Sequence, residues 1–252
     1  MSHVEPLKRL DDPAPPSVAA PGEPRVLPIH ADSPSATERR ARDALARLPL
    51  HQRKAKRIFD IVLTSAILFY LAPLLGIVYL LVRRDGGPAF YGHTRIGAGG
   101  ETFPCWKFRT MVVDAEAALK DLLERDPVAA AEWQRDFKLK KDPRVTGIGR
   151  FLRATSLDEL PQLYNVLRGE MSLVGPRPIV RDEMARYGAN IVEYLSCRPG
   201  LTGLWQVSGR NDVSYRQRVA LDTDYARHWS LGRDVAILFR TISVVAKRSG
   251  AY

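Results

Sequence analysis

The stretch IFDIVLTSAILFYLAPLLGIVYLLV, from Ile58 to Val82, decides how this chain is built. It is 25 residues long and apolar almost throughout. As a straight helix rising about 1.5 Å per residue, it could cross a bilayer core of about 30 Å. Buried helices of soluble proteins are rarely this long and apolar on every side. The stretch therefore predicts a membrane helix.

The path of this helix through a bilayer is a second question. Basic residues flank both ends of the run, namely Arg53, Lys54, Lys56 and Arg57 before it and Arg83 and Arg84 after it. Positive charge favours the cytoplasmic side, so two basic ends fit a single crossing poorly. Pro73 lies inside the run and removes a backbone donor. We therefore prefer a re-entrant hairpin that bends at Pro73 to a straight span, and expect Asp60 at the interface beside Lys56 or Arg57.

Three regions follow from the composition along the chain. Residues 1–50 hold nine of the 18 prolines and little apolar periodicity, which predicts a disordered Pro-rich tail with a short helix starting near Ala36. Residues 51–84 form the basic-flanked re-entrant membrane helix, and residues 85–252 form a compact cytosolic catalytic domain. The expected fold class is mainly α with a small β-hairpin, an α+β arrangement of short helices and loops.

Local patterns place the elements of the cytosolic domain. Residues 89–96 and 102–111 are β-rich and are separated by Gly97-Ala98-Gly99-Gly100, which predicts a hairpin. Residues 114–137 predict a helix that breaks at Asp126-Pro127, and residues 231–248 predict a last helix.

Charge and cysteine content narrow the choice of function. Lys and Arg number 38 against 28 acidic residues, a net charge of +10 that suits polyphosphates, anionic lipid surfaces or nucleic acid. Cys105 and Cys197 lie far apart and form no Cys-x-x-Cys pair, so we expect two reduced thiols. The five histidines are scattered without the spacing of metal ligands, and a zinc site is not expected.

The candidate chemistry lies in SLDELPQL, from Ser156 to Leu163. Ser156 and Glu159 have the spacing of a capping box, which by itself is a structural explanation for the acidic residues. A carboxylate in a first helical turn is kept ionised by backbone donors and the helix dipole. An ionised carboxylate can act as a nucleophile or bind Mg²⁺. Asp158 and Glu159 are therefore the candidate catalytic and metal-binding residues.

Arginines in stiff loops accompany the acidic pair. Arg150 and Arg153 precede it, and Arg177 follows within Gly175-Pro176-Arg177-Pro178. Arg198 and Arg210 bracket a further loop rich in glycine. The planar guanidinium group matches phosphate oxygens in two-pronged hydrogen bonding. Several arginines held in this way predict a site for a polyphosphate ligand.

Together these motifs resemble one family. From about residue 53 to residue 250 the chain resembles the bacterial sugar transferases, the monotopic phosphoglycosyl transferases, and most of all the small members of exopolysaccharide synthesis. The matching stretches are KRIFD at 56–60, KFRTM at 107–111, SLDELPQL at 156–163, SLVGPRP at 172–178 and RPGLTG at 198–203. One departure is Ala72-Pro73, where the family usually has Ser-Pro at the bend of its membrane helix.

The resemblance implies an undecaprenyl-phosphate sugar phosphotransferase. In such enzymes the aspartate attacks the β-phosphate of a UDP-sugar, commonly of glucose or galactose. UMP leaves, and the bound phosphosugar passes to undecaprenyl phosphate. Asp158 would be the nucleophile, and Glu159 would assist with Mg²⁺, for which both carboxylates are candidate ligands. The residues implied at the substrate phosphates are Arg153, Arg177, Arg210, Lys107 and Arg109.

The resemblance also implies a location and partners. It places the chain at the bacterial inner membrane with its catalytic domain on the cytoplasmic face, and it leaves a homo-oligomer open. The alternative is a membrane-tethered nucleic-acid-binding or adaptor protein, suggested by the net charge of +10. Such a protein would show a basic recognition helix or interleaved aromatic and basic residues, and the sequence has neither. We therefore expect no nucleic-acid partner.

Overall fold

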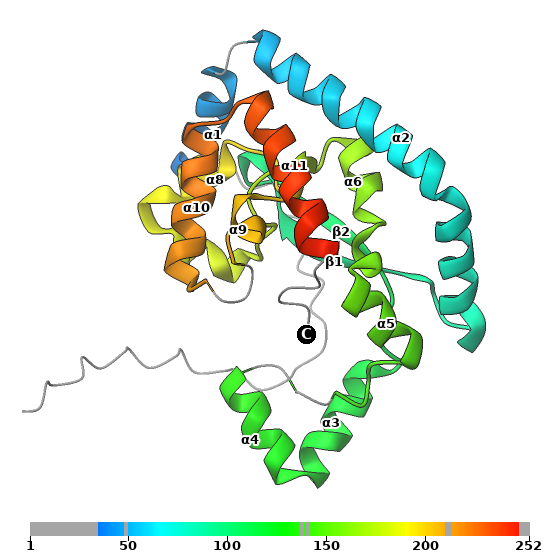
Figure 1. Cartoon of the computed structure of the whole chain (residues 1–252). Coiled ribbons are helices and arrows are strands. Elements are labelled where there is room, and N and C mark those ends of the chain that lie inside the picture. Colours follow the sequence, from blue (N-terminus) through cyan, green and yellow to red (C-terminus); the bar gives the residue numbers. More distant parts are fainter. Residues whose placement is uncertain (1–34, 48–49, 137–138, 140–141, 210–212, 247–252) are drawn as a thin grey trace, which may run out of the picture. The chain divides into compact units, whose positions relative to one another are not determined.

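The structure of the chain is a computed structural model that describes residues 35–47, 50–136, 139, 142–209 and 213–246. The described part is mainly helical, with two small two-stranded sheets (Figure 1). Its helices are α1 (Ala36–Arg47), α2 (Leu50–Val82), α3 (Ala115–Arg125), α4 (Pro127–Asp136), α5 (Gly147–Thr155), α6 (Gln162–Arg168), α7 (Met184–Tyr187), α8 (Ile191–Leu195), α9 (Leu204–Val207), α10 (Tyr215–Arg227) and α11 (Leu231–Ala246). The strands are β1 (Phe90–Ile96), β2 (Thr102–Phe108), β3 (Ser172–Val174) and β4 (Gly200–Thr202), and short 3₁₀ turns include η1 (Arg83–Asp85), η2 (Ala98–Gly100) and η3 (Leu157–Glu159).

Several predicted elements are confirmed. Strands β1 and β2 form the antiparallel hairpin, with Ile96 opposite Thr102 across its glycine turn. The predicted break between two helices lies at Asp126, because α3 ends just before it and α4 begins just after it. The last helix is α11. The fold class, mainly α with a small β-hairpin, is confirmed as well.

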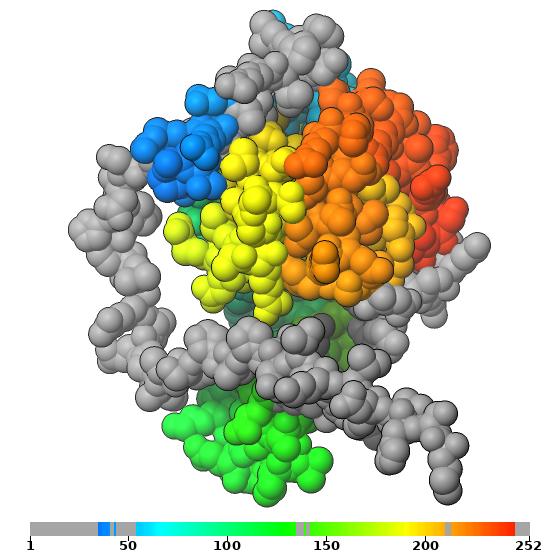
Figure 2. Space-filling view, turned by 90° about the vertical axis from the view of Figure 1, so that its left-hand side faces the viewer, coloured from blue at the N-terminus to red at the C-terminus, as the bar shows by residue number. Residues whose placement is uncertain are grey.

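The tail predicted over residues 1–50 is partly helical. Helix α1 begins at Ala36, where the sequence predicted a short helix. It packs against α8 and η2, and Figure 2 shows α1 in blue beside the yellow segment that contains α8. Residues 1–34 lie outside the described residues.

Helix α2 is one unbroken helix of 33 residues. Pro73 lies inside it and is exposed, and helical structure continues on both sides of this residue. The predicted bend is therefore not visible as a break, and the re-entrant hairpin stays a prediction. Within the described residues α2 is the one helix that is long and apolar enough to cross a membrane, judged by length and composition alone.

The two sides of α2 have different surroundings. Asp60, Thr64 and Val78 are buried against the rest of the domain. On other sides of the helix Phe69 is 77% exposed and Tyr70 is 79% exposed. Residues three or four positions apart share one face of a helix, so the buried residues form a docking stripe. The remaining apolar surface of α2 has no protein covering in the described part of the chain.

Asp60 is buried in the docking stripe, with 1% of its surface exposed. Its Oδ1 accepts hydrogen bonds from the Ser172 hydroxyl at 3.0 Å and from the Leu173 backbone N–H at 3.1 Å. Asp60 does lie near Lys56, as expected, but it is buried against the domain, and its position relative to a membrane interface stays a prediction. A buried carboxylate needs hydrogen-bond donors, and β3 supplies them.

Two basic residues that flank the apolar run also face the domain. Lys56 Nζ donates a hydrogen bond to Asp234 Oδ2 at 2.6 Å. Arg57 donates to the backbone carbonyls of Val166 at 2.5 Å and Leu167 at 2.6 Å. These carbonyls belong to the last turn of α6, where helices leave acceptors unpaired. Both charges thus fasten α2 to the domain.

The parallel strands β3 and β4 continue into two loops that cross at close range. The Gly175 N–H donates to the Thr202 carbonyl at 2.9 Å, and the Gly200 N–H donates to the Pro176 carbonyl at 2.8 Å. A Cβ atom on Gly175 or Gly200 would overlap backbone atoms of the other loop. The glycines of the two motifs therefore allow backbone to approach backbone.

We predict that Gly175→Ala destabilises the fold by about 3 kcal/mol, because the new methyl group cannot be placed without moving one loop. Gly232→Ala in α11 is the matched control, since nothing lies within 4 Å of its Cβ position. We expect that control to melt at or slightly above the wild-type temperature. Thermal unfolding of the solubilised protein measures both changes, and equal melting of the two variants would contradict the close crossing.

Candidate active site

The acidic pair lies in the short turn η3 between helices α5 and α6. Helix α5 ends at Thr155, and Ser156 adopts the left-handed conformation with φ of 57°. The Ser156 N–H donates to the Arg153 carbonyl, and its side chain caps no helix. The predicted capping box between Ser156 and Glu159 is therefore wrong. Ser156 ends α5 in the left-handed conformation and leads into η3 without a side-chain cap.

Asp158 lies in the single turn η3. Burial raises the pKa of its carboxyl to about 6, and the charge of Glu159 adds to the rise, while Lys107 and Arg153 lower it. The expectation that helix donors hold Asp158 firmly ionised is thus wrong, because one short turn offers little dipole. At neutral pH the carboxylate form still predominates. No other described residue donates a hydrogen bond to this carboxylate.

Glu159 is paired with a lysine from the hairpin. Lys107 Nζ on β2 donates to Glu159 Oε1 at 2.6 Å, and both side chains are about one-third exposed. Burial disfavours the charge on Lys107, but Glu159 and Asp158 outweigh it and raise the lysine pKa. Lys107 is therefore a fixed cation between two carboxylates.

A charged pocket of about 90 Å³ opens beside this pair. Three cations and one carboxylate contribute to its wall, so its charge is positive. Strands, turns and loops from five parts of the chain meet here. The residues that line it are Arg95, Cys105, Lys107, Glu159, Gln162, Arg177, Pro178, Gly200, Leu201, Trp205 and Gln206.

The structure brings together most of the predicted site residues that it describes. Lys107, Glu159 and Arg177 line the charged pocket. Arg153 lies near Asp158, whose pKa it lowers, and donates through Nε to the Thr110 hydroxyl at 2.9 Å. Arg210 falls outside the described residues.

Arg109 is the exception. It donates two hydrogen bonds to the Asp85 carboxylate, at 2.7 and 2.5 Å. It also donates to the carbonyls of Val82 at 3.0 Å and Pro88 at 2.7 Å. These partners hold the guanidinium at the C-terminal end of α2, and it does not line the charged pocket. These contacts give Arg109 a structural role at the end of α2, and its role at the substrate phosphates stays a prediction.

Arg95 and Trp205 line the pocket and were not predicted as site residues. Arg95 lies opposite Phe103 in the hairpin. Alternate residues share a face of a strand, so Arg95 lies on the same face as Cys105 and Lys107. The hairpin register would therefore have identified Arg95. Burial raises the pKa of the Cys105 thiol to about 11, so this cysteine is unsuited to act as a nucleophile.

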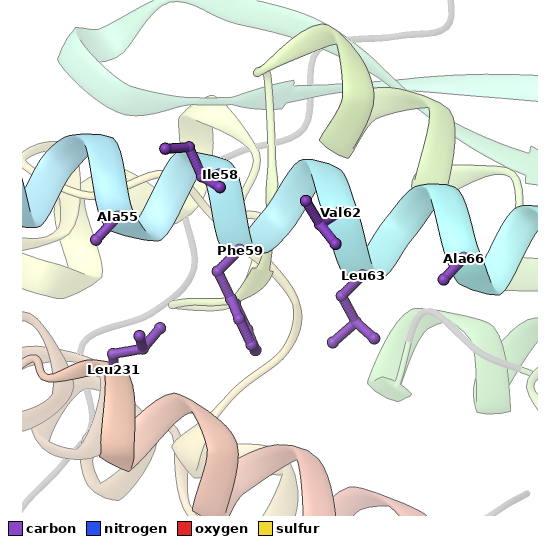
Figure 3. A pocket seen from close by; sticks show the side chains of 7 residues that line it. All are labelled: Ala55, Ile58, Phe59, Val62, Leu63, Ala66 and Leu231. Atoms are coloured by element: carbon purple, nitrogen blue, oxygen red, sulfur yellow. The ribbon is translucent and has the colours of Figure 1, made fainter.

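A separate apolar groove of about 620 Å³ lies between α2 and the start of α11. Figure 3 shows the side chains of Phe59 and Leu63 directed from α2 toward α11. All of its lining residues are apolar: Ala55, Ile58, Phe59, Val62, Leu63, Ala66 and Leu231. The groove is thus continuous with the exposed apolar surface of α2 and carries no charged group for catalysis.

Comparison with known proteins gives a family match over most of the chain. The model of the family described as bacterial sugar transferase matches residues 51–248. The match begins near the start of α2 and ends just beyond α11, so it includes the acidic pair and both crossing loops.

Named relatives carry transferase and exopolysaccharide descriptions. The undecaprenyl-phosphate galactose phosphotransferase of Salmonella typhimurium is 58% identical over 200 residues, which are 79% of this chain but 42% of that protein. The exopolysaccharide production protein ExoY of Rhizobium meliloti is 52% identical over 199 residues, 79% of this chain and 88% of that protein. A UDP-glucose:undecaprenyl-phosphate glucose-1-phosphate transferase of Caulobacter vibrioides is 42% identical over 206 residues, 78% of this chain and 72% of that protein. The chain thus spans about two fifths of the length of the Salmonella relative.

We predict that Arg109→Ala lowers the free energy of unfolding by about 2 kcal/mol, because it removes charge-assisted hydrogen bonds that hold the end of α2. Arg181→Ala is the control, since this side chain is exposed. Denaturation of the solubilised protein followed by tryptophan fluorescence gives both values. A substitution at Arg109 as mild as the control would show that these bonds do not secure the helix.

Proposed function

Because the chain belongs to the bacterial sugar transferase family, we propose that it transfers a hexose-1-phosphate from a UDP-sugar to undecaprenyl phosphate. The names of its relatives support glucose or galactose as the hexose and exopolysaccharide synthesis as the pathway, in which this would be the first membrane step. One observation carries the proposal. A carboxylate that accepts no hydrogen bond from another described residue, Asp158, lies beside a cationic pocket in a domain fastened to an apolar helix.

Asp158 is the nucleophile of the proposed reaction. A carboxylate oxygen bonds to the β-phosphorus of the UDP-sugar as the bond to the bridging oxygen breaks. UMP leaves with that oxygen and its electron pair. A phosphate oxygen of undecaprenyl phosphate then bonds to the same phosphorus, and the bond to Asp158 breaks. This covalent route suits Asp158 because its carboxylate accepts no hydrogen bond from another described residue, while the nearby charges of Lys107 and Arg153 favour its ionised form.

The cations of the pocket hold the phosphates. Lys107 is fixed by Glu159 at 2.6 Å, and Arg177 and Arg95 complete the cationic wall. Fixed positive groups stabilise the charge on the equatorial oxygens during phosphoryl transfer. One role of Glu159 is therefore to hold Lys107 between the two carboxylates.

Mg²⁺ fits the chemistry of this donor set. The described residues contain no cluster of three or more groups able to hold a metal ion. Mg²⁺ commonly binds through one or two carboxylates together with substrate phosphates, which is what Asp158 and Glu159 offer. When bound, the ion neutralises the charge of the diphosphate. Lys107 already engages one oxygen of Glu159, which leaves its second oxygen and Asp158 as the ligands.

The anchoring of α2 supports a re-entrant path with the catalytic domain on the cytoplasmic face. Its first turns are tied to the domain through Lys56 and Asp60, and its last residue, Val82, is tied through Arg109. A helix that crossed the bilayer would place its far end away from the domain that holds its near end. Both ends of α2 instead touch the same domain, and its outer surface is apolar. This arrangement suits a helix that enters and leaves by one face.

The charge distribution favours the transferase over nucleic-acid binding. Arg95 and Arg177 point into the pocket, and Arg57 and Arg109 bond to backbone carbonyls within the domain. Nucleic-acid-binding proteins carry their basic residues on one open face or along one helix. These four arginines are therefore engaged within the domain and do not form one open basic face.

We predict that cysteines introduced at Lys54 and Arg84, both exposed, react with a membrane-impermeant maleimide from the same side of the membrane. The labelling uses inside-out and right-side-out vesicles in parallel. The wild-type protein gives the background of the native Cys105 and Cys197, whose thiol pKa values burial raises to about 11. Labelling of the two positions from opposite sides would establish a straight span and exclude the re-entrant path.

We predict that Asp158→Asn lowers UMP release from a UDP-sugar, with undecaprenyl phosphate as acceptor, by at least about a thousandfold. The amide lacks the charge needed to attack phosphorus. Asp182→Asn is the matched control, because Asp182 is exposed and lies outside the charged pocket. The assay should compare UDP-glucose and UDP-galactose with their N-acetyl forms. Full turnover by Asp158→Asn would remove Asp158 from the role of nucleophile.

A further inference from the structure

An alternating stack of guanidinium groups and aromatic rings leads away from the charged pocket. Arg177 lies over one side of the Trp205 ring with 5.3 Å between its guanidinium carbon and the ring centroid, and Arg218 of α10 lies 4.7 Å from the same centroid. Arg218 also lies 5.7 Å from the Tyr215 ring, and Arg186 lies 4.9 Å from that ring. These contacts link residues from four separate parts of the chain.

The guanidiniums of Arg177 and Arg218 both contact the Trp205 ring, and the buried Asp222 carboxylate attracts both charges. Among the described residues no hydrogen bond or ion pair involves the guanidinium of Arg177 or that of Arg218. The Nε atoms of both are buried without a hydrogen-bond partner. A guanidinium within about 6 Å of an indole centroid is attracted by the negative face of the ring. Trp205 is therefore a ring that both guanidiniums contact directly.

The neighbouring carboxylate of Asp222 accepts a hydrogen bond from the Arg177 backbone and attracts the charge of its side chain without a hydrogen bond to the guanidinium. Asp222 is 1% exposed, and its Oδ2 accepts hydrogen bonds from the Tyr187 hydroxyl at 2.8 Å and from the Arg177 backbone N–H at 3.4 Å. Like charges work against the stack, since burial and the nearby Arg177 lower the pKa of Arg218. The Asp222 carboxylate offsets part of this repulsion, and the Trp205 ring supplies a contact shared by both guanidiniums.

The position of the stack relates it to the site. Arg177 and Trp205 line the charged pocket, whereas Arg218 does not. An indole in a nucleotide site would ordinarily be a candidate for stacking on the base. Both arginines already occupy positions over the Trp205 ring, so this ring serves the arginines instead.

We propose that Trp205 and Arg218 are positioning residues for Arg177: Arg218 holds the indole from one side, and the indole holds the Arg177 guanidinium at the wall of the charged pocket. The inference deepens the proposed function, because it rests on Arg177 binding a phosphate of the UDP-sugar. Arg218 has no contact with the substrate in this account and acts only through Trp205.

The test uses the full-length solubilised protein and the formation of UMP from a UDP-sugar. Arg218→Met and Trp205→Leu should each raise the KM for the UDP-sugar about tenfold with kcat little changed, since a cation–ring contact of ordinary strength is lost. Trp205→Phe keeps an aromatic face and should restore most of the affinity. Arg218→Lys keeps the charge but loses the planar group and should resemble Arg218→Met.

Arg186→Met is the matched control, because it loses an arginine stacked on Tyr215 that does not touch Trp205. Arg177→Met and the double variant Arg177→Met/Arg218→Met complete a double-mutant cycle. If Arg218 acts through Arg177, its substitution adds nothing once Arg177 is lost. Two outcomes would overturn the positioning role. One is that the effects of Arg177→Met and Arg218→Met on KM are fully additive. The other is that Arg218→Met raises KM no more than Arg186→Met does. An unchanged KM in Arg177→Met would instead refute the phosphate site itself.

Discussion

The burial of two charged side chains of α2 against β3 is the constraint on which the rest of the structure depends. Asp60 accepts hydrogen bonds from Ser172 and Leu173, and Lys56 Nζ donates to the Val174 carbonyl at 3.1 Å. A buried charge without such partners costs several kcal/mol, so α2 has one low-energy register on the domain. Strand β3 leads directly into the loop that carries Arg177. The same short strand therefore connects the apolar helix to the cationic pocket.

In the proposed reaction, this connection explains how one small domain serves a soluble and a lipid substrate. The outer surface of α2 and the groove beside Leu231 are apolar, while the charged pocket lies on the domain side of the helix. Polar residues at both ends of α2 hold it along the domain, so the domain stays close to any bilayer that takes up the helix. A phosphate on a membrane lipid and a nucleotide sugar from solution can then reach one carboxylate, Asp158.

Local sequence patterns predicted what depends on neighbouring residues, and they failed where distant segments meet. The apolar run of α2 and the glycine turn of the hairpin are local sequence patterns, and the structure contains both elements. The spacing of Ser156 and Glu159 also predicted a local capping box, but Ser156 instead ends α5. The stack on Trp205 and the position of Arg95 at the pocket wall join residues that are distant in the sequence, so local patterns do not predict them. Arg109 lies within a motif, yet it serves the end of α2 because Asp85 lies there.

The central claim is that Asp158 carries the phosphosugar between the two substrates. Incubation of the protein with a UDP-sugar in the absence of lipid, followed by an acid quench and mass spectrometry of its peptides, measures this most directly. The account predicts that the peptide containing Asp158 gains one hexose phosphate and loses it again when undecaprenyl phosphate is added. A hexose phosphate on another residue, or turnover without any modified peptide, would contradict the account.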